Sequence, residues 1–306
     1  MFLILSNQIL KMFLIILVGF ICFRSKLIDT QGNKALSNLL LMVVNPCVII
    51  DSFQIEFSNH LLKGLLCSLL LAFLSHVIGI LVGKFLLPAK NNPDYNVEQF
   101  CCMYSNCGFM GIPLINGILG SEGVLYITAY VVMFNIFCWT HGLLLMNGTT
   151  TAKQLKKVLV SPVMIGIFIG IFLFVTRIQL PGILSDSLGY LAAMNTPLGM
   201  LIAGIALAES DLLAALKNKR LYLVSFIKLF LIPVIMAVIL SFLPWDYNVL
   251  CTILVAAACP TATTCTMFAL RYNANYKHAS EIFAFTTVAC LITIPVIVSI
   301  ASPFLM

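Results

Sequence analysis

The sequence predicts an all-α membrane protein in which ten transmembrane helices form two inverted five-helix repeats. Three observations support this prediction: ten long apolar runs, basic residues concentrated in alternate connections, and two pairs of prolines about half a chain apart. Of the 306 residues, 61% are hydrophobic and only 9% are charged, whereas a soluble domain has about 25% charged residues. This composition argues against a soluble enzyme, a nucleic-acid-binding protein and a disordered chain.

Each apolar run is long enough for a membrane helix, which needs about 20 apolar residues. The connections are short and leave no room for a soluble domain. The first run lacks both a basic n-region and a small-residue cleavage site, so we expect it to be a retained helix rather than a signal peptide. The ten runs cover residues 3–23, 34–54, 61–87, 99–119, 122–146, 158–177, 186–208, 219–243, 248–270 and 279–304.

The basic residues predict the orientation of these runs. Lys63 and Arg177 are the only basic residues in connections after even-numbered runs, and Lys11 and Lys228 lie inside runs. Cytoplasmic connections carry an excess of Lys and Arg. The connections after odd-numbered runs are therefore predicted to be cytoplasmic, with both termini outside the cytoplasm. Their basic residues are Arg24, Lys26, Lys34, Lys84, Lys90, Lys153, Lys156, Lys157, Lys217, Lys219, Arg220, Arg271 and Lys277.

All eleven cysteines lie in or beside apolar runs. Buried cysteine behaves as a small hydrophobic residue, and no C-x-x-C pair of the kind found in zinc sites occurs. We therefore expect free thiols and no metal site.

The prolines indicate an internal repeat. Pro46 in the second run corresponds to Pro197 in the seventh run. Pro113 in the fourth run corresponds in the same way to Pro260 in the ninth run. Because each half contains an odd number of runs, the second half enters the membrane upside down, as in the inverted repeats of many secondary transporters.

The repeat defines the expected domain organisation. Residues 1–306 are predicted to form a single transmembrane unit. Residues 1–146 form the first five-helix repeat of this unit, and residues 158–306 form the second, inverted repeat.

The fourth and ninth runs are predicted to be broken at their prolines, because proline removes a backbone donor and clashes with the preceding turn. In hydrocarbon each freed backbone group costs several kcal/mol, so such breaks persist only inside protein or beside a wet cavity. Two breaks at matching positions are expected to meet near the membrane midplane. The second half-helices, starting at about Leu114 and Thr261, would present unpaired N–H groups that suit an anion.

The residues around these breaks form the predicted substrate site. The alternative is that Pro113 and Pro260 are ordinary kinks, which membrane helices tolerate. Their symmetrical placement among small and polar residues favours the paired breaks. The site residues are Asn106, Gly108, Gly111, Pro113, Pro260, Thr261, Thr263 and Thr264.

Two of these segments carry a family resemblance. Residues 106–114 are similar to the fourth-helix motif of the auxin efflux carrier family of bacteria and plants. Residues 260–264, followed by residues 270–272 and 279–280, are similar to its ninth-helix motif. Residues 139–142, 197–199 and 202–204 match weaker positions, and the similarity runs over nearly the whole chain.

The resemblance implies a fold related to the bile acid–sodium symporters, with the fourth and ninth helices crossing at their breaks. It also implies a homodimer and an elevator-like motion of a transport domain against a scaffold. Members of this family carry organic anions such as auxin, malate or malonate. The short connection between the fifth and sixth runs resembles the prokaryotic form and favours a small carboxylate.

Three ionisable residues at membrane depth are candidate coupling or charge sites, since such groups are costly there. Lys228 either attracts an anion or neutralises a carboxylate, or it extends to the cytoplasmic surface. Asp51 is either a proton or cation site or an outer helix end. His141 either titrates near neutral pH or is a hydrogen-bonded structural residue. Asn135 and Trp139, one turn apart, either face a cavity or pack at a helix interface.

The leading hypothesis is a secondary active transporter that moves a small organic anion, such as a malate-like or malonate-like carboxylate or an auxin-like acid, across the cytoplasmic membrane by alternating access. No H-E-x-x-H, G-x-S-x-G or Walker motif occurs, so we expect neither an enzyme nor a cofactor. The expected partners are the anion, the lipid bilayer and a second copy of the chain, with no nucleic acid. Uphill transport would then draw on an ion gradient or the membrane potential.

Two alternatives remain open from the sequence. One is a symporter or exchanger of the same fold that is coupled to H⁺ or Na⁺ and takes a different substrate. The fourth and ninth runs contain no carboxylate, which argues against a pure cation exchanger. The other is an intramembrane enzyme or sensor, for which we find neither a nucleophile–base pair nor a signalling domain.

Overall fold

The computed structural model describes residues 2–87, 92–148, 160–210 and 216–305. Their secondary structure is helical, and within these residues the only β-type pairing is one isolated bridge. Several residues used above lie outside the described ranges, namely Lys90, Lys153, Lys156, Lys157 and the domain boundaries at 1, 158 and 306.

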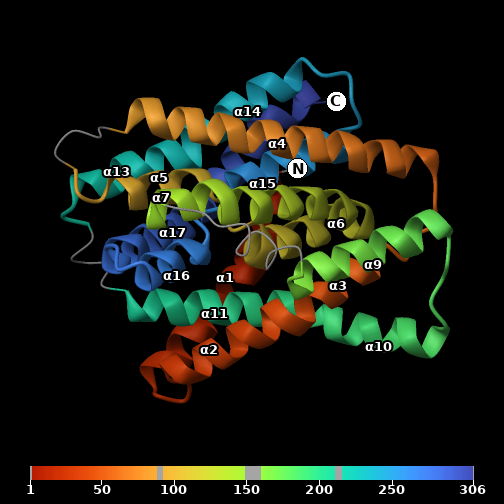
Figure 1. Cartoon of the computed structure of the whole chain (residues 1–306), viewed down its shortest axis with the longest axis horizontal. Helices are drawn as coiled ribbons and strands as arrows, with labels where there is room; N and C mark the ends of the chain where they lie inside the picture. The colour runs from red at the N-terminus through yellow and green to blue at the C-terminus, as the bar shows by residue number, and fades with distance from the viewer. Residues whose placement is uncertain (1, 88–91, 149–159, 211–215, 306) are drawn as a thin grey trace.

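The first part of the chain contains three long rods. The first is α1 (Phe2–Arg24), and the third is α4 (Asn59–Leu86). The second consists of α2 (Thr30–Leu39), the π-helix η1 (Leu40–Val44) and α3 (Asn45–Ser52) in direct succession. Most of the rods lie along the long axis of the molecule (Figure 1).

The next part contains the first interrupted rod. Helix α5 (Tyr95–Met103) is followed by an extended stretch, the π-helix η2 (Cys107–Gly111) and α6 (Ile112–Phe137). Gly120, with φ 64° and ψ −153°, divides α6 into two helices. The second of these continues through η3 (Cys138–Gly142) and α7 (Leu143–Asn147).

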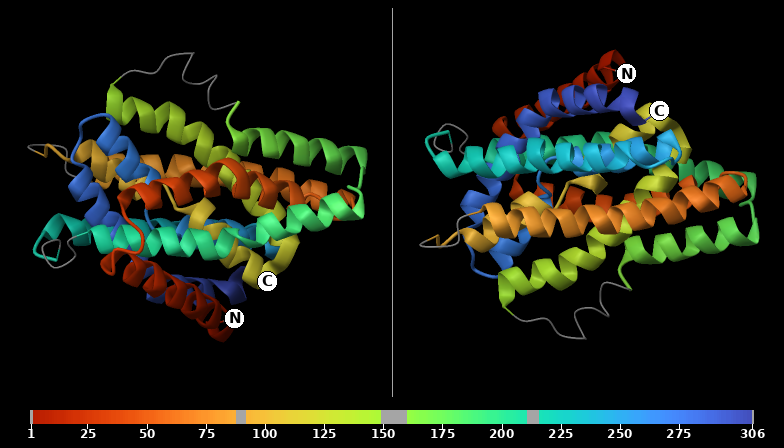
Figure 2. Two further views of the ribbon diagram at one scale, coloured as in Figure 1. Left: turned by 90° about the horizontal axis from the view of Figure 1, so that it is seen from below. Right: turned by 90° about the horizontal axis from the view of Figure 1, so that it is seen from above.

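The remaining helices include one more π-helix and one more interruption. They are α9 (Pro162–Thr176), α10 (Gly182–Ala193), α11 (Asn195–Glu209), α13 (Lys219–Phe226), η4 (Ile227–Leu231), α14 (Ile232–Ser241), α15 (Tyr247–Ala258), α16 (Thr263–Arg271) and α17 (Tyr276–Leu305). Helix α17 packs against α1, and the two ends of the chain lie near each other in both views of Figure 2. The second interruption lies between α15 and α16.

Seven rods of the described chain are long and apolar enough to cross a membrane: Ser6–Arg24, Thr30–Ser52, Asn59–Leu86, Cys107–Asn147, Gly182–Glu209, Lys219–Ser241 and Tyr276–Leu305. Two further apolar helices, Pro162–Thr176 and Tyr247–Ala258, are shorter. The described part of the chain is thus all-α and has the helices of a multi-pass membrane protein.

The predicted break beside Pro113 is wrong. The chain stays helical from Cys107 through Pro113, because the π-helix η2 ends two residues before the proline. A proline ring clashes with the carbonyl four residues back. In η2 the N–H of Ile112 bonds to the carbonyl of Cys107, five residues back, which widens the turn and removes this clash. Pro46 and Pro233 follow η1 and η4 at the same spacing.

Small residues allow α1 and α11 to approach closely. A Cβ atom added to Gly204 would lie 2.0 Å from the backbone oxygen of Ile16, and one added to Gly19 would lie 2.3 Å from that of Leu201. Close backbone contact of this kind is a main source of helix association in membranes.

The Gly204→Ala variant is therefore expected to be less stable by about 1–3 kcal/mol, because its new methyl group forces α1 away from α11. Thermal unfolding of the purified protein in detergent measures the effect. Gly182→Ala is the matched control, since nothing lies within 4 Å of its added Cβ atom. Equal melting temperatures for the two variants would contradict this packing.

Candidate functional site

Two interrupted helices meet in the buried interior of the molecule. Helix α5 ends at Met103, and the chain is extended through Tyr104–Asn106 before η2 begins. Helix α15 ends at Ala258, and the chain is extended through Cys259–Ala262 before α16 begins. The two stretches run antiparallel and pair at Ser105 and Thr261.

Backbone hydrogen bonds hold this crossing together. The N–H of Asn106 donates to the carbonyl of Pro260 at 2.8 Å, and the N–H of Ala262 donates to the carbonyl of Tyr104 at 2.8 Å. These bonds pair groups that a broken helix would otherwise leave open, which is a requirement for non-helical backbone at membrane depth. The break in the first helix thus lies at Tyr104–Asn106, seven or more residues before Pro113, while Pro260 lies inside the second break.

Side chains complete the ends of the first half-helices. The Thr261 hydroxyl donates to the carbonyl of Cys101 at 2.9 Å, near the end of α5. The Ser105 hydroxyl donates to the carbonyl of Ala257 at 3.3 Å, near the end of α15. Each stretch therefore caps the helix that leads into the other stretch.

Lys228 lies directly behind this crossing. Its side chain is 1% exposed, and its Nζ atom donates to the Ser105 hydroxyl and, at 3.3 Å, to the carbonyl of Ala257. An ammonium group is favourable at a helix C-terminus, where the carbonyls carry negative partial charge. Because it is fully buried, Lys228 does not extend to the surface, and it does not line either of the two cavities described below.

The second half-helices start at the crossing without side-chain caps. Neither η2 nor α16 receives a side-chain hydrogen bond at its N-cap residue. Asn106 precedes η2 and is 4% exposed, and its Nδ2 atom has no hydrogen-bond partner. An unpaired buried donor costs about 1–3 kcal/mol. A ligand that accepts a hydrogen bond would remove this cost.

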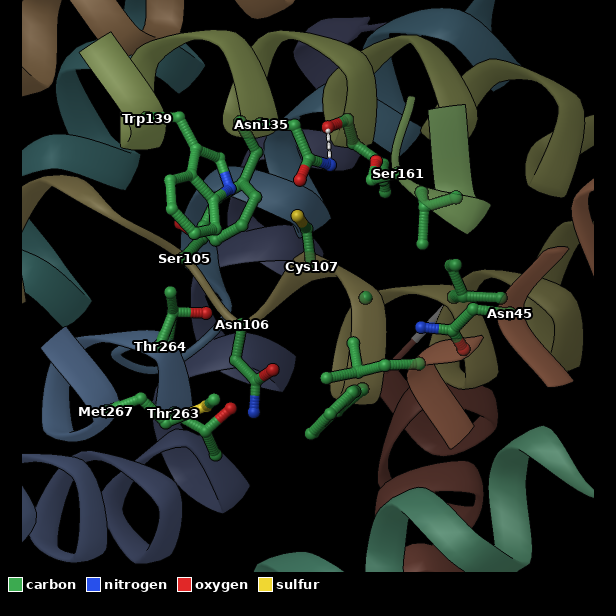
Figure 3. Close-up of a pocket in the computed structure, with 18 of the residues that line it drawn as sticks. Asn45, Ser105, Asn106, Cys107, Asn135, Trp139, Ser161, Thr263, Thr264 and Met267 are labelled. Carbon is green, nitrogen blue, oxygen red and sulfur yellow. Dashed lines mark hydrogen bonds between the residues drawn. The ribbon is translucent and has the colours of Figure 1, made fainter. Parts of the chain in front are cut away.

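Asn106 faces a cavity of about 270 Å³. Figure 3 shows Asn106, Thr263 and Thr264 on one side of this space, Asn45 on another, and Trp139 and Asn135 above. Pockets for drug-sized ligands occupy about 300–1,000 Å³, so the cavity suits a small molecule. Its remaining walls are mostly apolar and include Ile49, Ile112, Val131, Phe134, Met267 and Phe268.

Arg271 is the only charged residue among the described residues that line the cavity. It ends α16, eight residues after Thr263, and therefore lies about 12 Å along the helix axis from the crossing. Its guanidinium carbon lies 5.7 Å from the centre of the Tyr272 ring, and the described residues give it no ion-pair partner. The cavity thus has a positive charge at one end and uncapped helix N-termini at the other, which suits an anion.

The Arg271→Gln variant is accordingly expected to lower the rate of anion entry about three- to tenfold at low ionic strength. Since charge steering is screened by salt, the difference from wild type should shrink at 0.5 M salt. The rate at which benzoate associates with the purified protein, measured at two salt concentrations, reports this effect. Arg24→Gln, at the exposed end of α1, is the control; an Arg271→Gln defect that is unaffected by salt would contradict a steering role.

The structure separates the sequence-predicted site residues into groups. Asn106, Gly108, Thr263 and Thr264 line the cavity, and Asn135 and Trp139 face it as well. The other four predicted substrate residues do not line it: Gly111, Pro113, Pro260 and Thr261.

The three candidate charge sites also differ in position. Lys228 contacts the crossing, and Asp51 lines a second cavity. His141 is half-buried, and its Nδ1 atom lies 3.3 Å from the hydroxyl of Tyr104. This contact matches the structural alternative for His141.

Sequence reasoning missed an ion cluster around Glu98. The Glu98 side chain is fully buried and accepts two hydrogen bonds of 2.6 Å from Arg220. It also accepts one of 2.9 Å from Asn92 and lies 3.2 Å from Nε2 of His278. The cluster joins α5, α13 and α17 at one end of the bundle. The sequence signal that could have indicated this cluster is the position of Glu98, one residue before the apolar run 99–119.

Comparison with known proteins places the chain in a family. A family model described as "Membrane transport protein" matches residues 4–298. The chain belongs to this family. The resemblance to the auxin efflux carriers is thereby confirmed, since this family contains them.

Two archaeal relatives carry transporter names. An uncharacterised transporter of Methanothermobacter thermautotrophicus is 24% identical over 300 residues, covering 95% of this chain and 96% of the relative. Another from Methanocaldococcus jannaschii is 25% identical over 228 residues, covering 67% of this chain and 70% of the relative. This member of the membrane transport protein family is therefore a membrane transporter.

Proposed function

We propose that this membrane transport protein is a secondary active carrier for a small organic anion in the cytoplasmic membrane. The observation that carries the proposal is the unpaired Nδ2 atom of Asn106, which faces a mostly apolar cavity beside two uncapped helix N-termini. Asn106, Thr263 and Thr264 bind the carboxylate, and Arg271 attracts it. Helix N-termini bind anions through their N–H groups and their dipole.

The cavity favours one class of anion over another. The donors Asn106, Thr263 and Thr264 gather at the crossing and provide a place for one carboxylate. The apolar and aromatic part of the wall, which includes Trp139 and Phe134, suits an apolar body. Malate is too short to place its second carboxylate at Arg271, which lies about 12 Å along α16 from the crossing. That second charge would lack a partner, which is costly in an apolar site. The cavity therefore favours an auxin-like monocarboxylate as the substrate, with malonate-like acids second, whereas the short connection between the fifth and sixth runs favours a small carboxylate.

The proposed mechanism is alternating access in a ten-helix fold. The Gly120 turn supports the count, because it divides the 41-residue rod Cys107–Asn147 into two helices. Residues 1–146 and 158–306 form the inverted repeats, and the interrupted helices of the two repeats cross. The third to fifth and eighth to tenth helices carry the anion past the others in a homodimer, with both termini outside the cytoplasm.

Uphill transport requires an energy source, and a second candidate function follows if this source is a cation gradient. A cation-coupled symporter or exchanger of the same fold is favoured by a specific observation, namely the carboxylate of Asp51 in a separate polar cavity. Coupling to Na⁺ or H⁺ would then supply the energy.

Uptake of radiolabelled indole-3-acetate and malate by proteoliposomes tests the proposed function. We expect time-dependent accumulation of indole-3-acetate in vesicles that contain the protein, at a higher rate than for malate. Empty liposomes control for passive entry of the uncharged acid. An anion that binds the purified protein but never enters sealed vesicles would contradict transport and favour a sensor.

A further inference from the structure

A second cavity lies on the other side of α3. It has a volume of about 370 Å³ and is the more polar of the two. It is lined by Val48, Asp51, Ser52, Ile112, Pro113, Asn116, Ser121, Val124, Gly189, Ala192, Ala193, Asn195 and Thr196.

Helix α3 and one hydrogen bond separate the two cavities. Asn45 and Ile49 of α3 line the first cavity, whereas Val48 and Asp51 line the second. Nδ2 of Asn195 donates to Oδ1 of Asn45 at 2.6 Å, so an amide pair joins the two walls. The segment formed by η2 and α6 also separates the cavities. Cys107 and Gly108 at its start line the first cavity, and Pro113 lines the second.

The second cavity carries negative charge and free oxygen atoms. Asp51 is the only charged residue among its described lining residues, and its carboxylate has neither a hydrogen bond nor an ion pair within the described part of the chain. Asn195 is 3% exposed, and its Oδ1 atom is buried without a hydrogen-bond partner. The cavity also lies at the C-terminus of α3, where carbonyls add negative partial charge.

The negative charge of Asp51 would repel the organic anion that is proposed to bind at Asn106. If the anion bound at Asn106 became accessible from the second cavity, it would face the Asp51 carboxylate that lines this cavity. Like charges in a partly desolvated site repel strongly. A cation bound at Asp51 removes this repulsion, and its presence would make release or capture of the anion depend on the cation.

We propose that the cavity at Asp51 is a sodium site that couples cation movement to anion transport; the coupling rests on the proposed function, whereas sodium binding itself does not. The single negative charge of Asp51 neutralises a monovalent cation, whereas a divalent cation would keep one positive charge without a counter-charge. The amide oxygen of Asn195 and the oxygens of Ser52, Asn116, Ser121 and Thr196 provide neutral ligands, which a sodium ion uses and a proton does not need. Hard cations prefer such oxygen ligands.

Thermal unfolding of the purified full-length protein in detergent tests sodium binding, because a bound ligand stabilises the folded state. The probe is NaCl, compared with N-methyl-D-glucamine chloride at equal ionic strength. We expect NaCl to raise the melting temperature of the wild type and of Asp186→Asn, a control that removes an exposed carboxylate from α10. Asp51→Asn should lose this response or weaken its sodium dependence at least about tenfold.

Two results would overturn the proposal: a wild type that does not respond to NaCl, or an equal response in Asp51→Asn. If Asp51→Asn does not fold, Thr196→Val removes one neutral ligand and should weaken the sodium response severalfold. An unchanged response in that variant would also overturn the site.

Anion binding is measured separately, so that the two proposals can fail independently. Indole-3-acetate should raise the melting temperature of the wild type. Asn106→Ala should lose the response to indole-3-acetate and keep the response to NaCl. If the wild type responds to NaCl but not to any organic anion, the sodium site stands and the anion site fails.

Discussion

The double variant Asn106→Ala, Thr263→Ala is expected to raise the dissociation constant of indole-3-acetate about a hundredfold or more. Each side chain offers a hydrogen bond to a charged carboxylate, and bonds of this kind contribute about 1.5–3 kcal/mol. Two lost bonds therefore correspond to at least about two factors of ten in affinity. Titration of the purified protein with labelled indole-3-acetate measures the constant, and proteoliposome uptake should fall in parallel.

The variant should remain folded, because the Asn106 amide nitrogen has no protein partner to lose. Asn7→Ala and Thr176→Ala, both on exposed helix surfaces, combine into a control of identical chemistry. A double variant with wild-type affinity and a normal melting temperature would refute this assignment of the site.

The Glu98→Ala variant is expected to destabilise the protein by about 3–5 kcal/mol. Removal of one partner from a buried ion pair leaves the other charge without compensation. His278 is buried and would lose its contact with Glu98, and Arg220, which is one-third exposed, would lose two short hydrogen bonds. Because the cluster joins α5, α13 and α17, the loss should weaken the support of the first interrupted helix.

Thermal and denaturant unfolding in detergent measure this effect. Glu56→Ala removes an exposed glutamate and serves as the control. Glu98→Gln keeps the side-chain shape and should be intermediate. A Glu98→Ala variant within about 1 kcal/mol of the control would show that the cluster does not stabilise the bundle.

The sequence predicted the helical membrane class and the pairing of two interruptions, but it placed one of them incorrectly. The sequence predicts a break at Pro113 because proline disrupts a regular α-helix. The π-helix before it absorbs the disruption, and such a turn depends on tertiary packing that local patterns do not record. At Pro260 no π-helix precedes the proline, and the chain is extended there as predicted.

Other parts of the site required the three-dimensional structure. Arg271 belongs by sequence to a cluster of connecting residues that sets orientation, and only the direction of α16 brings it to the cavity. Asn45 precedes Pro46 in the second run, and nothing in the sequence indicates its contact with Asn195, which lies 150 residues further along the chain. Lys228 stands out in the sequence as a charge inside an apolar run, but it contacts Ser105 and Ala257 only because the two interruptions meet.

Density for a bound anion tests the central claim most directly. We suggest structure determination of the protein with 4-iodobenzoate, an aromatic monocarboxylate whose iodine atom locates the ring. The account predicts the carboxylate within hydrogen-bond distance of Asn106 and the start of α16, with the ring against Trp139. An iodine position outside this cavity, or a chain that runs helically through Tyr104–Asn106, would contradict it.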